Sequence, residues 1–275
     1  MRQIILTSIL FLALVLPCQS QMLQSVVTGK ASAVTDYTAD ANCMGAWFMN
    51  GGLSAGTDNE TDRSGEGTTL TESGGDIPNS ATVPAGYSGT SRDFERGDLE
   101  VLMEDDGGTT DINGADQSIS LVAWINPESM ADEGWQYVIG KHNHGTDKQY
   151  VLSILGTATS KYEILGRISA NGDDDIEVIS TTTDYSTSAW HHIAMVYNDT
   201  DIRIYVDGYL HSTPTAHTTG IFNGGDAFGV GSRDADNYTF DGLIDEPAVF
   251  DRELSAAEIL EIYRNGIDGT KGANN

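Results

Sequence analysis

The chain has few cysteines, with only Cys18 and Cys43 among its 275 residues. Cys18 follows the apolar run 4–16, which together with the basic Arg2 is typical of a secretory signal peptide, and we expect cleavage after Ser20. A mature chain that keeps Cys43 alone has no second thiol for an internal disulfide. Its stability must therefore come from burial or from a bound metal. We expect it outside the cell, in a periplasm or on a cell surface.

Basic residues are scarce as well. The chain has 14 Lys and Arg against 41 Asp and Glu, which gives a formal net charge of −27 at pH 7. Such a surface repels nucleic acid and anionic membranes, so neither is an expected partner. The surplus of carboxylates suits calcium, whose ligands are oxygen atoms. Beyond the signal peptide, no apolar run approaches the roughly 20 residues of a membrane-spanning helix, so no membrane insertion is predicted.

Signatures of catalysis are also missing. The sequence contains no phosphate-binding loop, no nucleophile elbow and no dinucleotide fingerprint. His142 and His144 have no third ligand at a spacing known for zinc. The acidic residues 173–175 and Glu177 follow an Asn-Gly reversal signal, and we interpret them as a hairpin tip rather than as paired catalytic carboxylates. No catalytic residue is predicted.

The chain does contain a succession of short segments with strand character. Segments 190–197 and 202–208 are rich in β-branched and aromatic residues, and the turn formers 198–201 separate them. Similar segments recur at close spacing with no Pro-rich or Ser-rich linker between them, which predicts one domain of two packed antiparallel sheets. The other expected strands are 44–51, 94–102, 119–127, 136–141, 149–155, 162–169, 176–181 and 240–250.

One helix is predicted near the end of the chain. The Ser255 hydroxyl can accept the free amide of Glu258, and the Glu258 carboxylate can reach back to the Ser255 amide. This reciprocal pattern is a capping box, which marks the start of a helix. Gly266 can take the positive φ of a left-handed stop.

Several of these segments resemble a known family. The motif W-H-H-I-A-M-V-Y at 190–197, the segment S-L-V-A-W-I-N-P at 120–127 and F-D-G-L-I-D-E at 240–246 are similar to signature strands of laminin G-like domains, in the concanavalin A-like lectin/glucanase superfamily. The resemblance implies an all-β fold, a two-sheet antiparallel jelly-roll sandwich with a short C-terminal helix. Pro247 lacks a ladder donor, so its strand is expected at an edge or locally broken.

The resemblance also divides the chain. Trp47, Trp124 and Trp190 fall on signature strands, and we assign them to the core. The run 190–208 is therefore expected to build the scaffold rather than the binding site. The expected divisions are a signal peptide at 1–20, a loosely ordered lead-in at 21–40, the laminin G-like domain at 41–268 and a flexible tail at 269–275.

A calcium site is implied by the same resemblance. In the family, calcium is often held near the rim by an early D-x-S-G loop and the late I-D-E strand, and the matching residues here are Asp62, Asp245 and Glu246. An ion between the first and last strands would tie down chain ends that no disulfide holds. The alternative is that Asp62 caps its own loop and that Asp245 pairs with an arginine such as Arg252.

Ligand binding is expected at exposed aromatic rings beside polar groups, because flat rings stack on the C–H faces of sugars. The candidates at or near strand ends are Trp135, Tyr137, Tyr150, Tyr185 and Tyr238. We predict a secreted, non-catalytic recognition domain that binds carbohydrate or glycoprotein with a structural calcium ion. An adhesive surface protein with protein partners is the alternative, and a glycoside hydrolase ranks third because no carboxylate pair at catalytic spacing is evident.

Overall fold

The computed structural model divides the chain into two compact units, Met1–Val34 and Thr35–Asn275. All helices and strands of the described residues belong to the second unit. The expected signal peptide, His144 and the last three residues of the expected tail lie outside the described residues. The structure describes residues 34–50, 59–104, 118–130, 134–143, 145–182, 184–232 and 238–272.

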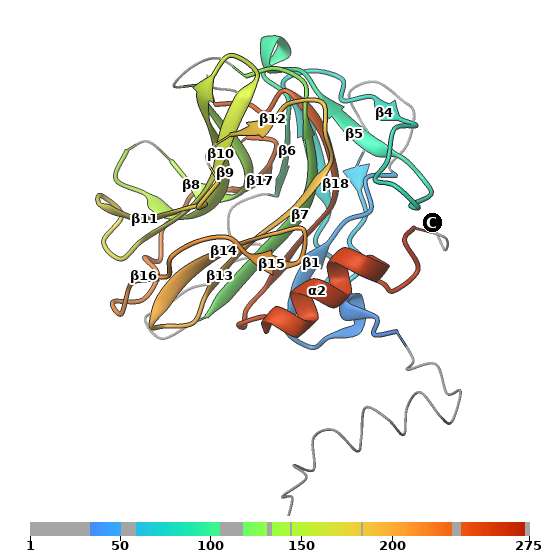
Figure 1. Cartoon of the computed structure of the whole chain (residues 1–275). Coiled ribbons are helices and arrows are strands. Elements are labelled where there is room, and N and C mark those ends of the chain that lie inside the picture. Colours follow the sequence, from blue (N-terminus) through green and yellow to red (C-terminus); the bar gives the residue numbers. More distant parts are fainter. Residues whose placement is uncertain are drawn as a thin grey trace, which may run out of the picture. The chain divides into compact units, whose positions relative to one another are not determined.

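Two antiparallel sheets face each other and form a sandwich (Figure 1). The strands of the first sheet are β1 (Cys43–Ala46), β4 (Asn79–Ser80), β5 (Ser91–Phe94), β7 (Ile119–Pro127), β13 (His191–Tyr197), β14 (Asp201–Val206), β15 (Tyr209–Leu210), β16 (Thr215–Ala216) and β18 (Gly242–Phe250). Their order is β15-β14-β13-β7-β18-β5-β4, with β1 also paired to β18 and β16 to β14. The three signature motifs thus form the adjacent central strands β13, β7 and β18.

The second sheet faces the first across the core. Its strands are β2 (Asn59–Glu60), β3 (Leu70–Ser73), β6 (Val101–Glu104), β8 (Trp135–His142), β9 (Lys148–Ala158), β10 (Lys161–Ser169), β11 (Asp175–Ile179), β12 (Tyr185–Ser186) and β17 (Phe228–Val230). They run in the order β11-β10-β9-β8-β17-β6-β3-β2, with β12 paired to β10. The predicted two-sheet antiparallel sandwich is confirmed.

The main hydrophobic core lies between the sheets, because alternate residues of each strand point inward. On β7 these residues are Leu121, Ala123 and Ile125, all fully buried. Trp47 lies in the same core with 0% of its surface exposed, and its indole N–H donates to the carbonyl of Thr68 at 2.9 Å. The assignment of Trp47 to the core is confirmed.

A second hydrophobic cluster covers the outer face of the first sheet. Helix α2 (Ala256–Asn265) packs Ile259 and Ile262 onto this face, where Val122 and Phe250 belong to the same cluster (Figure 1). The first sheet is therefore buried on both faces, and the alternation of polar and apolar residues is lost along its central strands. Within the described ranges, no helix has the length and apolar character needed to cross a membrane.

Helix α2 begins as predicted. The Ser255 hydroxyl accepts the Glu258 amide at 3.3 Å, and the Glu258 carboxylate accepts the Ser255 amide at 2.7 Å. At the other end, the Gly266 amide donates to the carbonyl of Ile262 at 2.8 Å. Gly266 has φ 83° but ψ 166°, so the helix stops at a positive φ without the left-handed conformation that was expected.

The packed unit includes residues before 41. Tyr37, in the 3₁₀ helix η1 (Tyr37–Ala39), is buried; its amide donates to the carbonyl of Ile267 at 2.8 Å and its hydroxyl to the Glu261 carboxylate at 3.0 Å. Toward the C-terminus, the Lys271 carbonyl accepts the Ser88 amide at 3.0 Å. Hydrogen bonds near α2 therefore hold both ends of the described domain.

Strand β18 differs in part from expectation. It lies between β7 and β5 rather than at an edge. The expected local break is present, because the register with β7 shifts between Asp245 and Ala248, and Glu246 takes a φ of 45°. This bulge accommodates Pro247, which has no N–H to donate. The carbonyl of Pro247 accepts the Trp47 amide at 3.0 Å.

Candidate functional site

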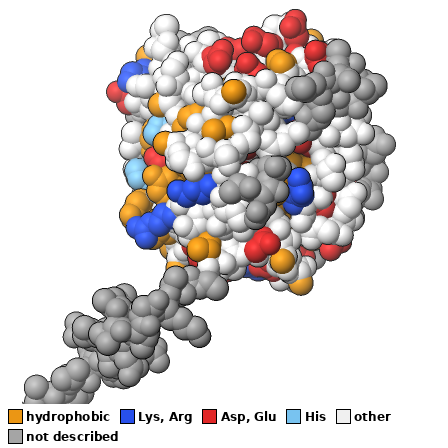
Figure 2. Space-filling view, turned by 90° about the vertical axis from the view of Figure 1, so that its right-hand side faces the viewer, with side chains coloured by type: hydrophobic (Ala, Val, Ile, Leu, Met, Phe, Trp, Pro, Cys, Tyr) orange, Lys and Arg blue, Asp and Glu red, His pale blue; other side chains and the backbone are white. Residues whose placement is uncertain are grey.

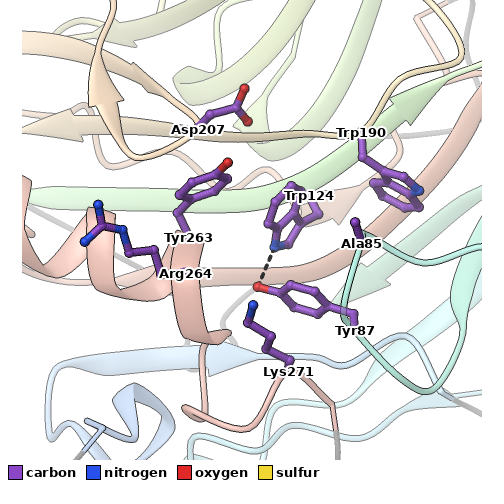
Figure 3. A pocket seen from close by; sticks show the side chains of 8 residues that line it. All are labelled: Ala85, Tyr87, Trp124, Trp190, Asp207, Tyr263, Arg264 and Lys271. Carbon is purple, nitrogen blue, oxygen red and sulfur yellow. Dashed lines mark hydrogen bonds between the residues drawn. The ribbon is translucent and has the colours of Figure 1, made fainter. Parts of the chain in front are cut away.

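A pocket of about 370 Å³ lies against the outer face of the first sheet, beside α2 (Figure 3). Stretches of chain that are far apart in the sequence supply its walls, among them β7, the turn after β14 and the last turn of α2. We call it the α2 pocket. Its lining residues are Ala85, Tyr87, Trp124, Trp190, Asp207, Tyr263, Arg264 and Lys271.

Aromatic rings dominate this lining. The Trp124 ring lies 5.3 Å from that of Tyr87 and 5.5 Å from that of Tyr263, measured between centroids. The indole N–H of Trp124 donates to the Tyr87 hydroxyl at 3.1 Å, a bond drawn in Figure 3. Trp190 lies across the pocket near Ala85 and is half-buried. Trp124 itself is 6% exposed, so it forms the floor.

Polar groups stand around these rings. The carboxylate of Asp207 lies 2.9 Å from Nδ1 of His191 and accepts the backbone amide of His192 at 3.0 Å. The Lys271 ammonium lies 5.6 Å from the centroid of the Tyr87 ring, close enough for a cation–π contact. Arg264 is exposed at the end of α2, beyond Tyr263 in Figure 3. The pocket therefore combines flat apolar surfaces with groups of both charges.

His192 supports the floor from within the sheet. Its ring lies 5.3 Å from Trp124 and 6.1 Å from Tyr263, and the side chain is buried. Burial lowers the pKa of His192 to about 4, although the nearby Asp207 carboxylate acts in the opposite direction. The ring is therefore neutral at pH 7, and Nδ1 is a buried atom with no hydrogen-bond partner among the described residues.

Two buried carboxyl groups on β18 also act on the pocket. Burial raises the pKa of Glu246 to about 8, and it raises that of Asp245 well above its usual range. Glu246 accepts the Ile267 amide at 3.0 Å, which fixes the segment leading to Lys271. The pKa of Tyr87 is raised mainly by burial and next by the charge of Glu246. The Tyr87 hydroxyl is therefore protonated, and it can donate a hydrogen bond.

The residues expected to hold calcium have other contacts. One oxygen of Asp62 accepts the amides of Ala46 at 3.0 Å and Ser64 at 2.8 Å, and the other accepts the Ser64 hydroxyl at 2.6 Å and the Gly67 amide at 2.9 Å. This is the loop-capping arrangement that formed the alternative. Arg252, the arginine named in the other half of that alternative, pairs with Asp40 and Glu258 rather than with Asp245. Calcium stays a prediction.

Three other carboxylates converge elsewhere. Oxygen atoms of Asp93, Glu95 and Glu128 all lie within 4.8 Å of one another, a grouping with the donor type that calcium takes. Burial, followed by repulsion from neighbouring acids including Asp241, raises the pKa of each group. The acidic run 173–175 lies at the hairpin tip between the paired strands β10 and β11, as interpreted, and Asp175 also contacts His142 at 2.9 Å.

The aromatic residues predicted to bind ligand lie on the second sheet or beside it, away from the α2 pocket. Tyr150 is 0% exposed and cannot stack on a ligand, and Tyr137 is also buried. Tyr238 stacks on Tyr137 with 5.6 Å between ring centroids. Trp135 is half-buried, with the Arg167 guanidinium 3.7 Å above its ring. Within the protein, these rings therefore pack on one another or beneath a cation.

The sequence analysis missed the α2 pocket. It assigned Trp124 and Trp190 to the core and placed Asp207 in the strand segment 202–208 of the scaffold, whereas all three line the pocket. One signal was available: Trp124 alternates with the inward-facing Ala123 and Ile125, so it has to face outward from the sandwich. What the sequence did not reveal is that α2 and the segment carrying Tyr87 come together on that outer face.

Solved structures with the same architecture include domain 4 of AbnA, an extracellular GH43 arabinanase from Geobacillus stearothermophilus in complex with arabinotriose. It is 15% identical, with a TM-score of 0.57, and the match covers 81% of this chain and 98% of that one. The binding domain of botulinum neurotoxin DC, in complex with rat synaptotagmin II, is 13% identical with a TM-score of 0.60, and coverage is 81% and 51%.

A structure of botulinum neurotoxin type C, whose cell entry is described as dependent on two ganglioside molecules, is 12% identical with a TM-score of 0.56. Coverage is 84% of this chain and 53% of that one. The chain thus spans about half the length of the neurotoxin chains it matches. At such low identity these likenesses show the fold alone.

A comparison with curated proteins gave no match. A family model, however, matches residues 104–260, which is more than half of the chain. Its description is the concanavalin A-like lectin/glucanases superfamily. The matched region includes the central strands β7 and β13 and the first half of α2. The chain therefore belongs to the concanavalin A-like lectin/glucanases superfamily.

Proposed function

We propose that this chain is a secreted, non-catalytic carbohydrate-recognition domain and that the α2 pocket is its binding site. The observation that carries the proposal is the gathering of four aromatic rings, those of Tyr87, Trp124, Trp190 and Tyr263, in one pocket with ionic groups at its rim. Apolar ring faces cover sugar C–H groups, while the polar groups take the hydroxyls. The volume of about 370 Å³ suits a small ligand.

A binding role fits the acid groups of this pocket better than hydrolysis does. Glycoside hydrolysis needs two carboxyl groups, one on each side of the scissile bond. Asp207 is the carboxylate in the described lining, and both of its oxygens are engaged, by His191 and by the His192 amide. The arabinotriose bound to the AbnA domain and the gangliosides named for the type C neurotoxin support glycan binding on this fold.

Adhesion through protein partners is the second candidate. Tyr209 and Leu210, on the edge strand β15, are 55% and 48% exposed, and Ile176 and Ile179 on the edge strand β11 are 37% and 39% exposed. Exposed apolar side chains on sheet edges suit contact with another protein. The neurotoxin DC binding domain in complex with synaptotagmin II is a protein-binding example of the same fold.

Trp190→Ala should weaken glycan binding about tenfold or more, since a stacked ring contributes on the order of 1.4 kcal/mol or more. The measurement is a glycan array followed by calorimetry with the best binder. Both are run with calcium and then with a chelator, which also tests the calcium prediction. Trp190 is half-buried, so the variant should remain folded.

The matched control is Trp135→Ala, which removes a half-buried tryptophan from the second sheet. We expect its affinity to equal that of the wild type. An equal loss of glycan affinity in Trp190→Ala and Trp135→Ala would contradict the assignment of the binding site to the α2 pocket. If the wild type binds no glycan on the array, the result would favour the adhesive function.

A further inference from the structure

Most basic side chains of the described chain are neutralised by a carboxylate. In a protein with 41 acidic and 14 basic residues, a cation that finds no carboxylate partner is unusual. Arg92 shows the common situation, since it contacts two buried glutamates. The ion-paired residues are Arg92, Lys148, Lys161, Arg167, Arg203 and Arg252.

The cations of the α2 pocket are exceptions. Among the residues that the structure describes, the basic side chains that make neither a hydrogen bond nor an ion pair are those of Arg63, Arg264 and Lys271. Two of these three line the α2 pocket. Lys271 points toward the aromatic rings, and Arg264 stands at the rim next to Tyr263 (Figure 3).

The one acid in the lining does not cancel them. The Asp207 carboxylate is occupied by the His191 ring at 2.9 Å and by the His192 amide at 3.0 Å, both outside the ring cluster that faces the ligand. The buried carboxyl group of Glu246 is close enough to Lys271 for their charges to interact, but it forms no ion pair with Lys271. Figure 2 shows one face of the molecule, on which acidic side chains gather along the upper edge and others lie lower down, near basic and hydrophobic groups.

We propose that the α2 pocket selects an acidic sugar, one that carries a carboxylate or a sulfate. The anionic group pairs with Lys271, while Arg264 reaches it from the rim with the two-pronged geometry that carboxylates and sulfates accept. The sugar ring lies on Trp190 and Trp124. This inference rests on the proposed function and adds the chemical class of the ligand.

A cation beside aromatic rings is well placed to bind the anionic group of a sugar. The contact of Lys271 with the Tyr87 ring, at 5.6 Å, holds the ammonium near the pocket without removing its charge. The protonated Tyr87 hydroxyl lies close by, bonded to the Trp124 indole at 3.1 Å, and offers a further donor to an anion. Lys271, Arg264 and the Tyr87 hydroxyl therefore give the pocket three donor groups for an anionic ligand.

The test uses an array of galacturonate, glucuronate and sulfated oligosaccharides beside their neutral counterparts, followed by calorimetry at low and high salt. We expect acidic members to bind at least about tenfold more tightly than the neutral ones, with affinity falling as salt rises. Lys271→Gln should remove roughly tenfold of the affinity for the acidic sugar and so reduce the preference for acidic over neutral members. Binding to uronates only, or to sulfates only, identifies the anionic group.

The matched control is Arg63→Gln. It removes one unpaired cation from a separate small pocket lined by Phe48 and Asn50, and it should leave affinity unchanged. Equal binding of acidic and neutral sugars, unaffected by Lys271→Gln but lost in Trp190→Ala, would overturn this inference and leave the proposed function standing. Absence of binding to every saccharide by the folded wild type would overturn both.

Discussion

Arg92→Ala should destabilise the domain by about 3–5 kcal/mol, the usual cost of breaking a buried ion pair. Arg92 lies on β5 and is completely buried between the sheets. Its Nε contacts Glu60 at 2.5 Å, and Nη1 contacts Glu72 at 3.0 Å and the carbonyl of Ile77. Removing the guanidinium takes a contacting positive charge away from two carboxylates whose side chains are at most 3% exposed. Urea unfolding followed by tryptophan fluorescence measures the loss.

The contribution of the buried carboxylate charges to this loss of stability can be separated from the contribution of lost packing. Arg92→Leu combined with Glu60→Gln and Glu72→Gln removes the two carboxylate charges together with the arginine, so it should recover more than half of the stability lost in Arg92→Leu alone. Arg203→Ala is the matched control, since this arginine forms a partly exposed pair with Asp201 and should cost less than about 1 kcal/mol. Similar losses in Arg92→Ala and Arg203→Ala would show that burial does not strengthen the Arg92 network.

The fold was predictable because its signals are local. Alternation along a strand requires only neighbouring residues, and the capping box at Ser255 and Glu258 spans four residues. The effect of Pro247 was half predictable. A missing N–H has to interrupt the ladder, and it does so, but the position of β18 in the middle of the sheet depends on which strands pair with it.

The site was less predictable because it is assembled from distant residues. Tyr87, Trp124 and Tyr263 meet only after α2 folds over the outer face of the first sheet. The sequence does not show that α2 covers the outer face of the first sheet. Without that knowledge, an apolar residue on a central strand can be assigned equally well to the core or to a pocket. The burial of Asp245 and Glu246 could not be read from hydropathy either, since carboxylates are rarely enclosed.

The domain should lose stability in mild acid through His192. The folded-state pKa of this histidine is about 4, below its ordinary value of 6.5, because burial penalises the imidazolium. Between these two values the unfolded chain binds a proton that the folded chain does not, so the free energy of unfolding falls as pH falls through this window. One pKa unit is worth about 1.4 kcal/mol, so the loss by pH 4 is roughly 3 kcal/mol. Urea unfolding at a series of pH values measures it.

His192→Phe isolates this contribution. Phenylalanine keeps a ring against Trp124 and Tyr263 and cannot take up a proton, so the difference in stability between variant and wild type should shift by roughly 3 kcal/mol in favour of the variant from neutral pH to pH 4. The other acids and histidines titrate in both proteins and cancel in this difference. His211→Gln, which changes a half-buried histidine outside the pocket lining, should leave the pH profile close to that of the wild type. Parallel profiles for wild type and His192→Phe would mean that the buried ring accepts a proton without penalty.

Because His192 supports Trp124, we expect glycan affinity in the wild type to fall over the same pH range, and His192→Phe should retain it.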